Sequence, residues 1–170
     1  MTTASLAPET LHAWAICLQA SEEARRRGDR RYGTDHLLLA LFEDPSIEVV
    51  LGVNLQQARQ SLESLDREAL GALGLGSGAD APPLPMRAVP KKPRIRDVAQ
   101  KDRLRITPTA KKVLEDAVKP NRRKTQVTAQ QVLAQILPLQ PPDPAAVLLG
   151  ALGVNASEVR ARMDATTPGS

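Results

Sequence analysis

The sequence predicts an all-α fold of two pseudo-symmetric four-helix repeats joined by a long Pro/Gly-rich, basic linker. Three observations support this. The 170 residues are 42% hydrophobic, but only Trp14, Tyr32 and Phe42 are aromatic, so a core of Leu, Val, Ile and Ala is expected, which favours helices over a β-sandwich. Helix start and stop signals recur in one order in both halves of the chain. A segment rich in Pro and Gly separates these halves.

Positive charge is concentrated in the middle of the chain. The net charge is +4, yet residues 87–124 alone carry 14 Lys or Arg against four acidic residues. Cys17 is the only cysteine, which excludes an intramolecular disulfide. No signal peptide is visible, and no apolar segment approaches the roughly 20 residues that cross a bilayer. We therefore expect a soluble cytoplasmic protein with no membrane partner.

The first helix is expected to run from about Pro8 to Gly28. Basic residues at 25–27 favour the C-terminal end of a helix, and glycine commonly follows such an end. Spacings of three and four residues define its expected apolar face, which consists of Leu11, Trp14, Ala15 and Leu18.

The stretch from Gly33 to Phe42 predicts a buried central helix that extends to about Glu43. Thr34 is the expected N-cap and Asp35 places a negative charge in the first turn. Apolar residues follow on almost every side, as in a helix that a bundle surrounds. His36 is interpreted as a structural partner inside the bundle rather than as a ligand or a base.

Two further helices complete the first repeat, residues 8–73. The Asp-Pro pair at 44–45 predicts a helix through Leu51, which Gly52 ends. Asn54 and Gln57 form a capping-box pattern at the start of a fourth helix. The apolar stripe of that helix consists of Leu55, Ala58, Leu62, Leu65 and Ala69.

Residues 74–105 are predicted to form a flexible linker, because Gly and Pro interrupt every periodic pattern there. The second repeat, residues 106–165, repeats the landmarks of the first. Thr128 corresponds to Thr34, the Asp-Pro pair at 143–144 to that at 44–45, and Gly-Val-Asn at 153–155 to the same triplet at 52–54. This order of caps and stops indicates two copies of one unit.

Several of these motifs resemble those of a known family. Residues 33–41, Gly-Thr-Asp-His-Leu-Leu-Leu-Ala-Leu, resemble the Gly-Thr-Glu-His-Leu-Leu-Leu signature of the Clp N-terminal repeat domain, which precedes the ATPase modules of Clp unfoldases. Residues 51–54 are similar to the family's Leu-Gly-Val step before its fourth helix, and residues 106–115 to the opening of a ClpC-type second repeat. The resemblance covers most of residues 8–73 and 106–164.

The resemblance implies a domain that binds proteins without a cofactor. For the ClpC type it further implies recognition of phosphorylated arginine, in which the Glu of the motif receives the guanidinium group and polar groups at helix starts receive the phosphate. The ligand-binding residues implied for this chain are Thr34, Asp35 and Thr107. Ala129 takes the acidic position in the second repeat and cannot pair with a cation, so at most one pocket is expected. Alternatively, Thr34 and Asp35 only cap a helix.

The sequence offers little for catalysis. A P-loop requires a Gly-Lys pair, and none occurs, so we expect a stand-alone docking domain without its ATPase modules. On a helix, Cys17 and His12 would project about 140° apart, and they do not form a nucleophile–base pair. The His and Cys residues have no metal-ligand spacing. No enzyme activity, catalytic residue, metal or cofactor is expected.

The leading hypothesis is a protein-interaction module. Its expected partners are Clp substrates, adaptors or components of a Clp ATPase–protease, and it would act as an accessory or decoy of proteolysis in protein quality control. The alternative is a nucleic-acid-associated protein whose basic linker binds phosphates by charge. The scarcity of aromatic residues argues against modules that stack bases. The sequence leaves the oligomeric state open.

Overall fold

The computed structural model describes residues 10–74, 104–121 and 126–166. These ranges are mostly helical and contain eight α-helices, which confirms the all-α prediction. The expected linker, except for its ends, lies outside the described residues, together with nearly all of its basic run. The repeat boundaries and the pseudo-symmetry of the repeats stay predictions.

The α-helices follow the order that the start and stop signals indicate, and four short strands, which were not predicted, lie among them within the described residues. In the first segment they are β1 (Thr10–His12), α1 (Ala13–Arg27), β2 (Arg31–Tyr32), α2 (Thr34–Ala40), a 3-10 turn (Leu41–Glu43), α3 (Pro45–Leu51) and α4 (Leu55–Ala72). In the remaining segments they are β3 (Arg105–Ile106), α6 (Pro108–Val118), a 3-10 turn (Lys119–Asn121), β4 (Gln126–Thr128), α7 (Ala129–Ile136), α8 (Pro144–Ala151) and α9 (Ala156–Thr166).

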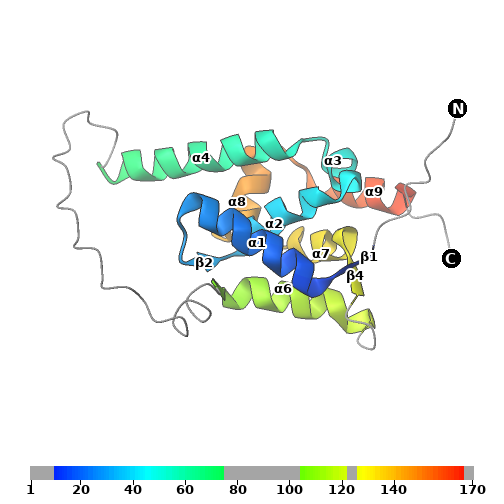
Figure 1. The fold of residues 1–170 in the computed structure, drawn as a ribbon. Coiled ribbons are helices and arrows are strands. Elements are labelled where there is room, and N and C mark those ends of the chain that lie inside the picture. The colour runs from blue at the N-terminus through cyan, green and yellow to red at the C-terminus, as the bar shows by residue number, and fades with distance from the viewer. Residues whose placement is uncertain (1–9, 75–103, 122–125, 167–170) are drawn as a thin grey trace, which may run out of the picture.

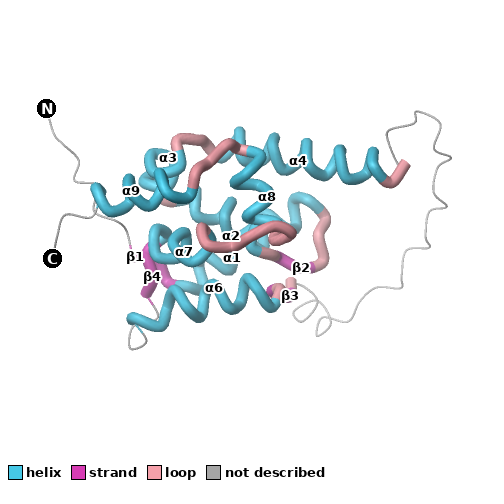
Figure 2. The backbone as a smooth tube through the Cα atoms, turned by 180° about the vertical axis from the view of Figure 1, so that it is seen from behind, coloured by secondary structure: helices cyan, strands magenta, loops and turns pink. Residues whose placement is uncertain are grey.

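Two small sheets join the first part of the chain to the last. β1 pairs antiparallel with β4, and Leu11 lies opposite Val127. β2 pairs parallel with β3, and Tyr32 lies opposite Ile106. Figure 2 shows the two pairs at opposite ends of the helical body. Because β2 precedes α2 and β3 precedes α6, this second pair brings the starts of those two helices together.

Helix α2 lies at the centre of the fold, as the sequence predicted. All seven of its residues are buried, and it contacts α1, α4, α6, α7 and α8. Figure 1 shows α2 between these helices, with α4 running along one side of the body. The surrounding core is almost entirely aliphatic, as expected from the scarcity of aromatic residues.

The predicted start of the first helix is wrong within the described residues. α1 begins at Ala13, and the residues just before it form β1 instead. The physical reason is the backbone pairing of Leu11 with Val127. Such long-range pairing overrides a local helical pattern.

The predicted apolar face of α1 is also wrong. Trp14 is 66% exposed and Leu18 is 50% exposed. The buried face carries Ile16, Ala20 and Ala24, which are spaced four residues apart. Small side chains at two of these positions allow α1 to pack closely on α2.

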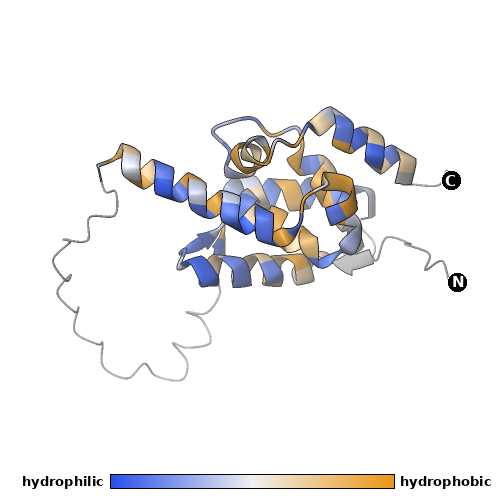
Figure 3. Ribbon diagram, turned by 90° about the horizontal axis from the view of Figure 1, so that it is seen from above, coloured by the Kyte–Doolittle hydropathy of each residue, from blue (hydrophilic) through white to orange (hydrophobic). Residues whose placement is uncertain are grey.

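The capping predictions for α4 are confirmed, but its expected stripe is only partly buried. Asn54 and Gln57 exchange hydrogen bonds of 2.9 Å as a capping box. Ala58 and Leu62 are buried, whereas Ala69 is exposed. In Figures 1 and 3 the far end of α4 extends past the other helices, so this end has nothing in the described chain to pack against.

Candidate functional site

Gly33, not Thr34, is the N-cap of α2. The backbone N–H of Gly33 donates to Nδ1 of His36 at 3.2 Å, so the imidazole takes the part that a Glu or Gln has in a capping box. Nε2 of His36 lies 3.1 Å from Oδ2 of Asp29. His36 is buried and fully engaged within the fold, which agrees with the structural role expected for it.

Thr34 is the first residue of α2 and faces the second half of the chain. Its hydroxyl donates a 2.7 Å hydrogen bond to Oδ1 of Asp143. The same carboxylate oxygen caps α8 by accepting from the N–H of Ala145 at 3.0 Å. Thr34 is 1% exposed. It therefore holds α2 against the start of α8 and does not present its hydroxyl to a ligand in this conformation.

Asp35 is a buried carboxylate that contacts Arg27 and His36. Oδ2 accepts a 3.1 Å hydrogen bond from Nη1 of Arg27, and Oδ1 lies 3.0 Å from Nδ1 of His36. Burial by itself raises the pKa of Asp35, but its contacts with His36, including the backbone N–H, and the charge of Arg27 outweigh burial and lower the pKa below its usual value. Asp35 is therefore ionised at neutral pH.

Asp35 and Thr107 both approach Gly33. A Cβ added to Gly33 would lie 2.7 Å from Oδ1 of Asp35 and 3.8 Å from Cγ2 of Thr107. The backbone N–H of Thr107 donates to the carbonyl oxygen of Tyr32 at 3.0 Å, which fixes the approach of the two chains. Thr107 also caps α6, because its hydroxyl accepts from the N–H of Ala110 at 3.4 Å. Of the three residues that the sequence nominated, the structure thus brings Asp35 and Thr107 together.

The corresponding start of α7 differs from the expected register. Thr128 is the N-cap of α7 and exchanges hydrogen bonds of 3.0 and 3.1 Å with Gln131, as predicted. Because Gly33 is the N-cap of α2, Asp35 is the second helical residue, and its positional equivalent in α7 is Gln130 rather than Ala129. Gln130 is buried and uncharged. Only the α2 site therefore carries an acidic residue at this position.

Sequence reasoning missed the charged cluster around Arg27. Besides Asp35, this guanidinium group lies 2.5 Å from Oδ2 of Asp66 and 3.7 Å from Oδ2 of Asp29. Asp66 is on α4, so the cluster ties the end of α1 to both α2 and α4. The only signal in the sequence was the basic last turn of α1, and it did not indicate which carboxylates Arg27 contacts.

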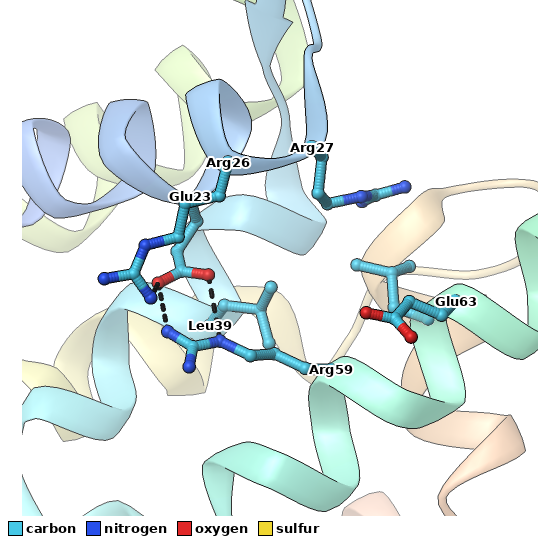
Figure 4. A pocket seen from close by; sticks show the side chains of 7 residues that line it. Glu23, Arg26, Arg27, Leu39, Arg59 and Glu63 are labelled. Atoms are coloured by element: carbon cyan, nitrogen blue, oxygen red, sulfur yellow. Dashed lines mark hydrogen bonds and ion pairs between the residues drawn. The ribbon is translucent and has the colours of Figure 1, made fainter.

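A cavity of about 250 Å³ lies beside this cluster, between α1 and α4 (Figure 4). Glu23 is buried there and accepts from Nη2 and Nε of Arg59 at 2.5 and 3.1 Å. Charged side chains and two leucines line the cavity: Glu23, Arg26, Arg27, Leu39, Arg59, Leu62 and Glu63.

Two shallower hollows, of about 530 and 400 Å³, adjoin the exposed ring of Trp14. Cys17 borders both, and Leu114 and Leu18 border one each. Burial raises the pKa of the Cys17 thiol, and a hydrogen bond with Tyr32 only partly opposes this. Cys17 is thus a thiol rather than a reactive thiolate at neutral pH.

Among residues 10–74, 104–121 and 126–166, no group of three His, Cys, Asp or Glu side chains could hold a metal ion. Within those same ranges no helix is long and apolar enough to cross a membrane. The arrangement at Gly33 places an ionised, buried carboxylate, which contacts Arg27 and His36, near the capped start of α6.

Comparison with known proteins places these features in a family. The chain is similar to the crystal structure of the N-terminal domain of the caseinolytic protease associated chaperone ClpD from Arabidopsis thaliana, with 17% identity and a TM-score of 0.57, over 96% of this chain and 99% of that one. At this identity the similarity shows the fold alone. No curated protein matches the chain. Residues 9–138 match the model of the Clp repeat (R) N-terminal domain, and the chain therefore belongs to that family.

Proposed function

We propose that this chain is a protein-interaction module that binds substrate proteins or adaptors of Clp-type proteolysis and acts as an accessory or decoy of that system. Membership of the Clp repeat N-terminal domain family supports an interaction role in general. The observation that carries the proposal is the approach of both Asp35 and Thr107 to Gly33. The proposal includes two repeats, residues 8–73 and 106–165, whose helix starts form the docking site.

The proposed ligand group is a phosphorylated arginine of the partner protein. Its guanidinium group would pair with the carboxylate of Asp35, whose lowered pKa keeps it charged. Its phosphate would lie at the start of α6, where the hydroxyl of Thr107 and the helix N-terminus favour an anion. Arg27 already donates to Oδ2 of Asp35, so the incoming guanidinium group has to share or displace that contact.

In this proposal Thr34 is a positioning residue. Its hydroxyl is committed to Asp143, and this bond sets the direction of the first turn of α2, on which Asp35 lies. Asp35 and Thr107 are the residues that would contact the ligand. No cofactor, metal or catalytic step is part of the proposed function.

Binding of a matched pair of peptides tests the proposal. One peptide carries a single phosphoarginine, the other an unmodified arginine, and fluorescence anisotropy measures the affinity of each. We expect the phosphorylated peptide to bind more tightly, and Asp35→Asn to weaken its binding about tenfold, because one charge-assisted contact is lost. Asp164→Asn, an equal charge change at an exposed residue of α9, should leave binding unchanged.

Three results would count against the proposal. They are equal affinity for both peptides, no binding of either, and full binding by a folded Asp35→Asn variant. Tight binding of duplex DNA that falls steeply with salt, in the absence of peptide binding, would favour the nucleic-acid alternative. Retention of purified Clp ATPase–protease components on the immobilised protein separates an accessory from a decoy that binds substrates only.

A further inference from the structure

The cavity between α1 and α4 has an ordered charged wall. Glu23 and Arg59 form a two-contact ion pair, and both side chains are largely buried, with 12% and 25% of their surface exposed. Nη1 of Arg26 lies 3.5 Å from Oε1 of the same glutamate. In Figure 4 this group forms one side of the cavity and Glu63, on α4, lies across from Arg26.

Several donors in this wall have no acceptor in the described part of the chain. The contacts of Arg59 use Nε and Nη2, which leaves Nη1. The contact of Arg26 uses Nη1, which leaves Nε and Nη2, and its side chain is 62% exposed. By contrast, all three nitrogens of the Arg27 guanidinium group face carboxylates. Arg26 and Arg59 therefore hold the hydrogen-bonding capacity that a ligand can use.

The only acidic side chain of the lining without a partner among the described residues is that of Glu63. It is exposed and lies one helical turn from Arg59 on α4. A carboxylate in this place competes with any anion that enters and attracts any cation. Removal of the Glu63 charge should therefore strengthen the binding of an anion and weaken the binding of a cation.

We infer that this cavity binds a carboxylate carried on a short apolar stem. Arg27 is held by three carboxylates, so the unused donors of the cavity belong to the two guanidinium groups of Arg26 and Arg59, which suit a monoanion. A phosphate dianion would meet stronger repulsion from Glu23 and Glu63. A volume of about 250 Å³ accommodates one side chain but is small for a nucleotide. Leu39 and Leu62 supply apolar contact for the methylene groups of the stem.

Such a carboxylate has two sources in a protein partner, a Glu or Asp side chain or the free C-terminus of a chain. Either would give the domain a second contact with a partner, separate from the start of α2. The inference does not depend on phosphoarginine recognition, because neither Arg26 nor Arg59 contacts Asp35 or Thr107 in the described structure. Arg27 lies between the two sites and faces both.

Three short peptides of one neutral sequence test the inference against the full chain. The first has capped ends and one internal Glu, the second an internal Gln and a free C-terminal carboxylate, and the third an internal Gln and capped ends. Chemical shifts of backbone amides in α1 and α4 follow each titration. We expect the first or the second peptide to bind and the third to give no shifts, and which of the first two binds identifies the source.

Two charge-neutralising variants with matched controls sharpen the test. Arg26→Gln should weaken binding of the carboxylate peptide about threefold or more, the size of a partly exposed ion pair. Glu63→Gln should strengthen it by a similar factor, because it removes the competing carboxylate. The controls are Arg30→Gln and Glu68→Gln, which change the same charges at exposed residues outside the cavity, and neither should alter binding.

Each contrary outcome overturns the inference in a distinct way. Binding of a lysine-containing peptide that Glu63→Gln abolishes would make the cavity a cation site. Equal shifts with all three peptides would mean contact without charge recognition, and no shifts at millimolar concentration would mean that there is no site. Loss of carboxylate binding in Asp35→Asn but not in Arg26→Gln would move the site to the start of α2.

Discussion

The hydroxyl of Thr34 donates a 2.7 Å hydrogen bond to Oδ1 of Asp143, a residue 109 positions later in the chain. Asp143 in turn caps α8. A single carboxylate oxygen thus fixes the start of two helices, one from each half of the chain. The first turn of α2, which carries Asp35, is held in place by this contact.

Replacement of Thr34 by Val should destabilise the fold. The change keeps the shape of the side chain but leaves the Asp143 carboxylate without one donor, and hydrogen bonds to charged groups contribute about 1.5–3 kcal/mol. Urea unfolding followed by circular dichroism measures the loss. Thr34→Ser retains the hydroxyl and should recover most of the stability; equal losses for Val and Ser would mean that the methyl group, not the hydrogen bond, matters.

Removal of Arg59 should leave Glu23 as a buried, poorly compensated carboxylate. Breaking such a pair costs about 3–5 kcal/mol, and we expect the lower end because Arg26 still reaches Glu23. The midpoint of thermal or urea unfolding of Arg59→Ala checks this. Arg67→Ala, at an exposed position on the same helix, should change stability by about 0.5 kcal/mol or less. A stable Arg59→Ala variant would show that Glu23 gains water or another partner.

A methyl group at Gly33 should collide with Asp35. The added Cβ would lie 2.7 Å from Oδ1, and the short side chain of Asp35 is held by Arg27 and His36. We expect Gly33→Ala to cost about 1–3 kcal/mol, as overpacking does. The double variant Gly33→Ala/Asp35→Ala should lose less than the sum of the single changes. Additive losses would contradict the close approach.

Asp35 should make stability depend on pH in the acid range. Its pKa is lower in the folded protein than in the unfolded chain, so the unfolded chain binds the proton more readily. Its stabilisation is therefore fully present above the unfolded value of about 3.9 and is lost as the pH falls through the folded pKa. Unfolding free energies of the wild type and Asp35→Asn should converge below pH 4. A difference that stays constant from pH 7 to pH 3 would refute the assignment.

Local signals predicted the helix boundaries well, because caps are interactions between neighbouring residues. The Asp44 cap, the Asn54–Gln57 box and the Thr128–Gln131 box all form as expected. The N-cap of α2 was missed because Thr34 has the higher cap propensity. His36 satisfies the backbone N–H of Gly33 through its ring, and this shifts the helix start by one residue.

Long-range contacts account for what the sequence did not predict. α1 carries two possible apolar stripes, and the stripe with the larger side chains, Trp14 and Leu18, is the exposed one. Which stripe is buried depends on how closely α1 approaches α2, and the local spacing of apolar residues gives no information about that distance. The contact of Arg27 with Asp66 could not be predicted from local sequence either, because the two residues are 39 positions apart. Asp35 and Thr107 were nominated only through resemblance, and their proximity follows from the pairing of β2 with β3.

The central claim is that Asp35 and Thr107 form a docking site for phosphorylated arginine. Titration of the ¹⁵N-labelled protein with free phosphoarginine, observed by two-dimensional NMR, tests it most directly. We expect saturable shifts of the backbone amides of Gly33, Asp35 and Thr107, with arginine and inorganic phosphate at equal concentration producing much smaller ones. An unperturbed spectrum, or shifts confined to residues away from the starts of α2 and α6, would contradict it.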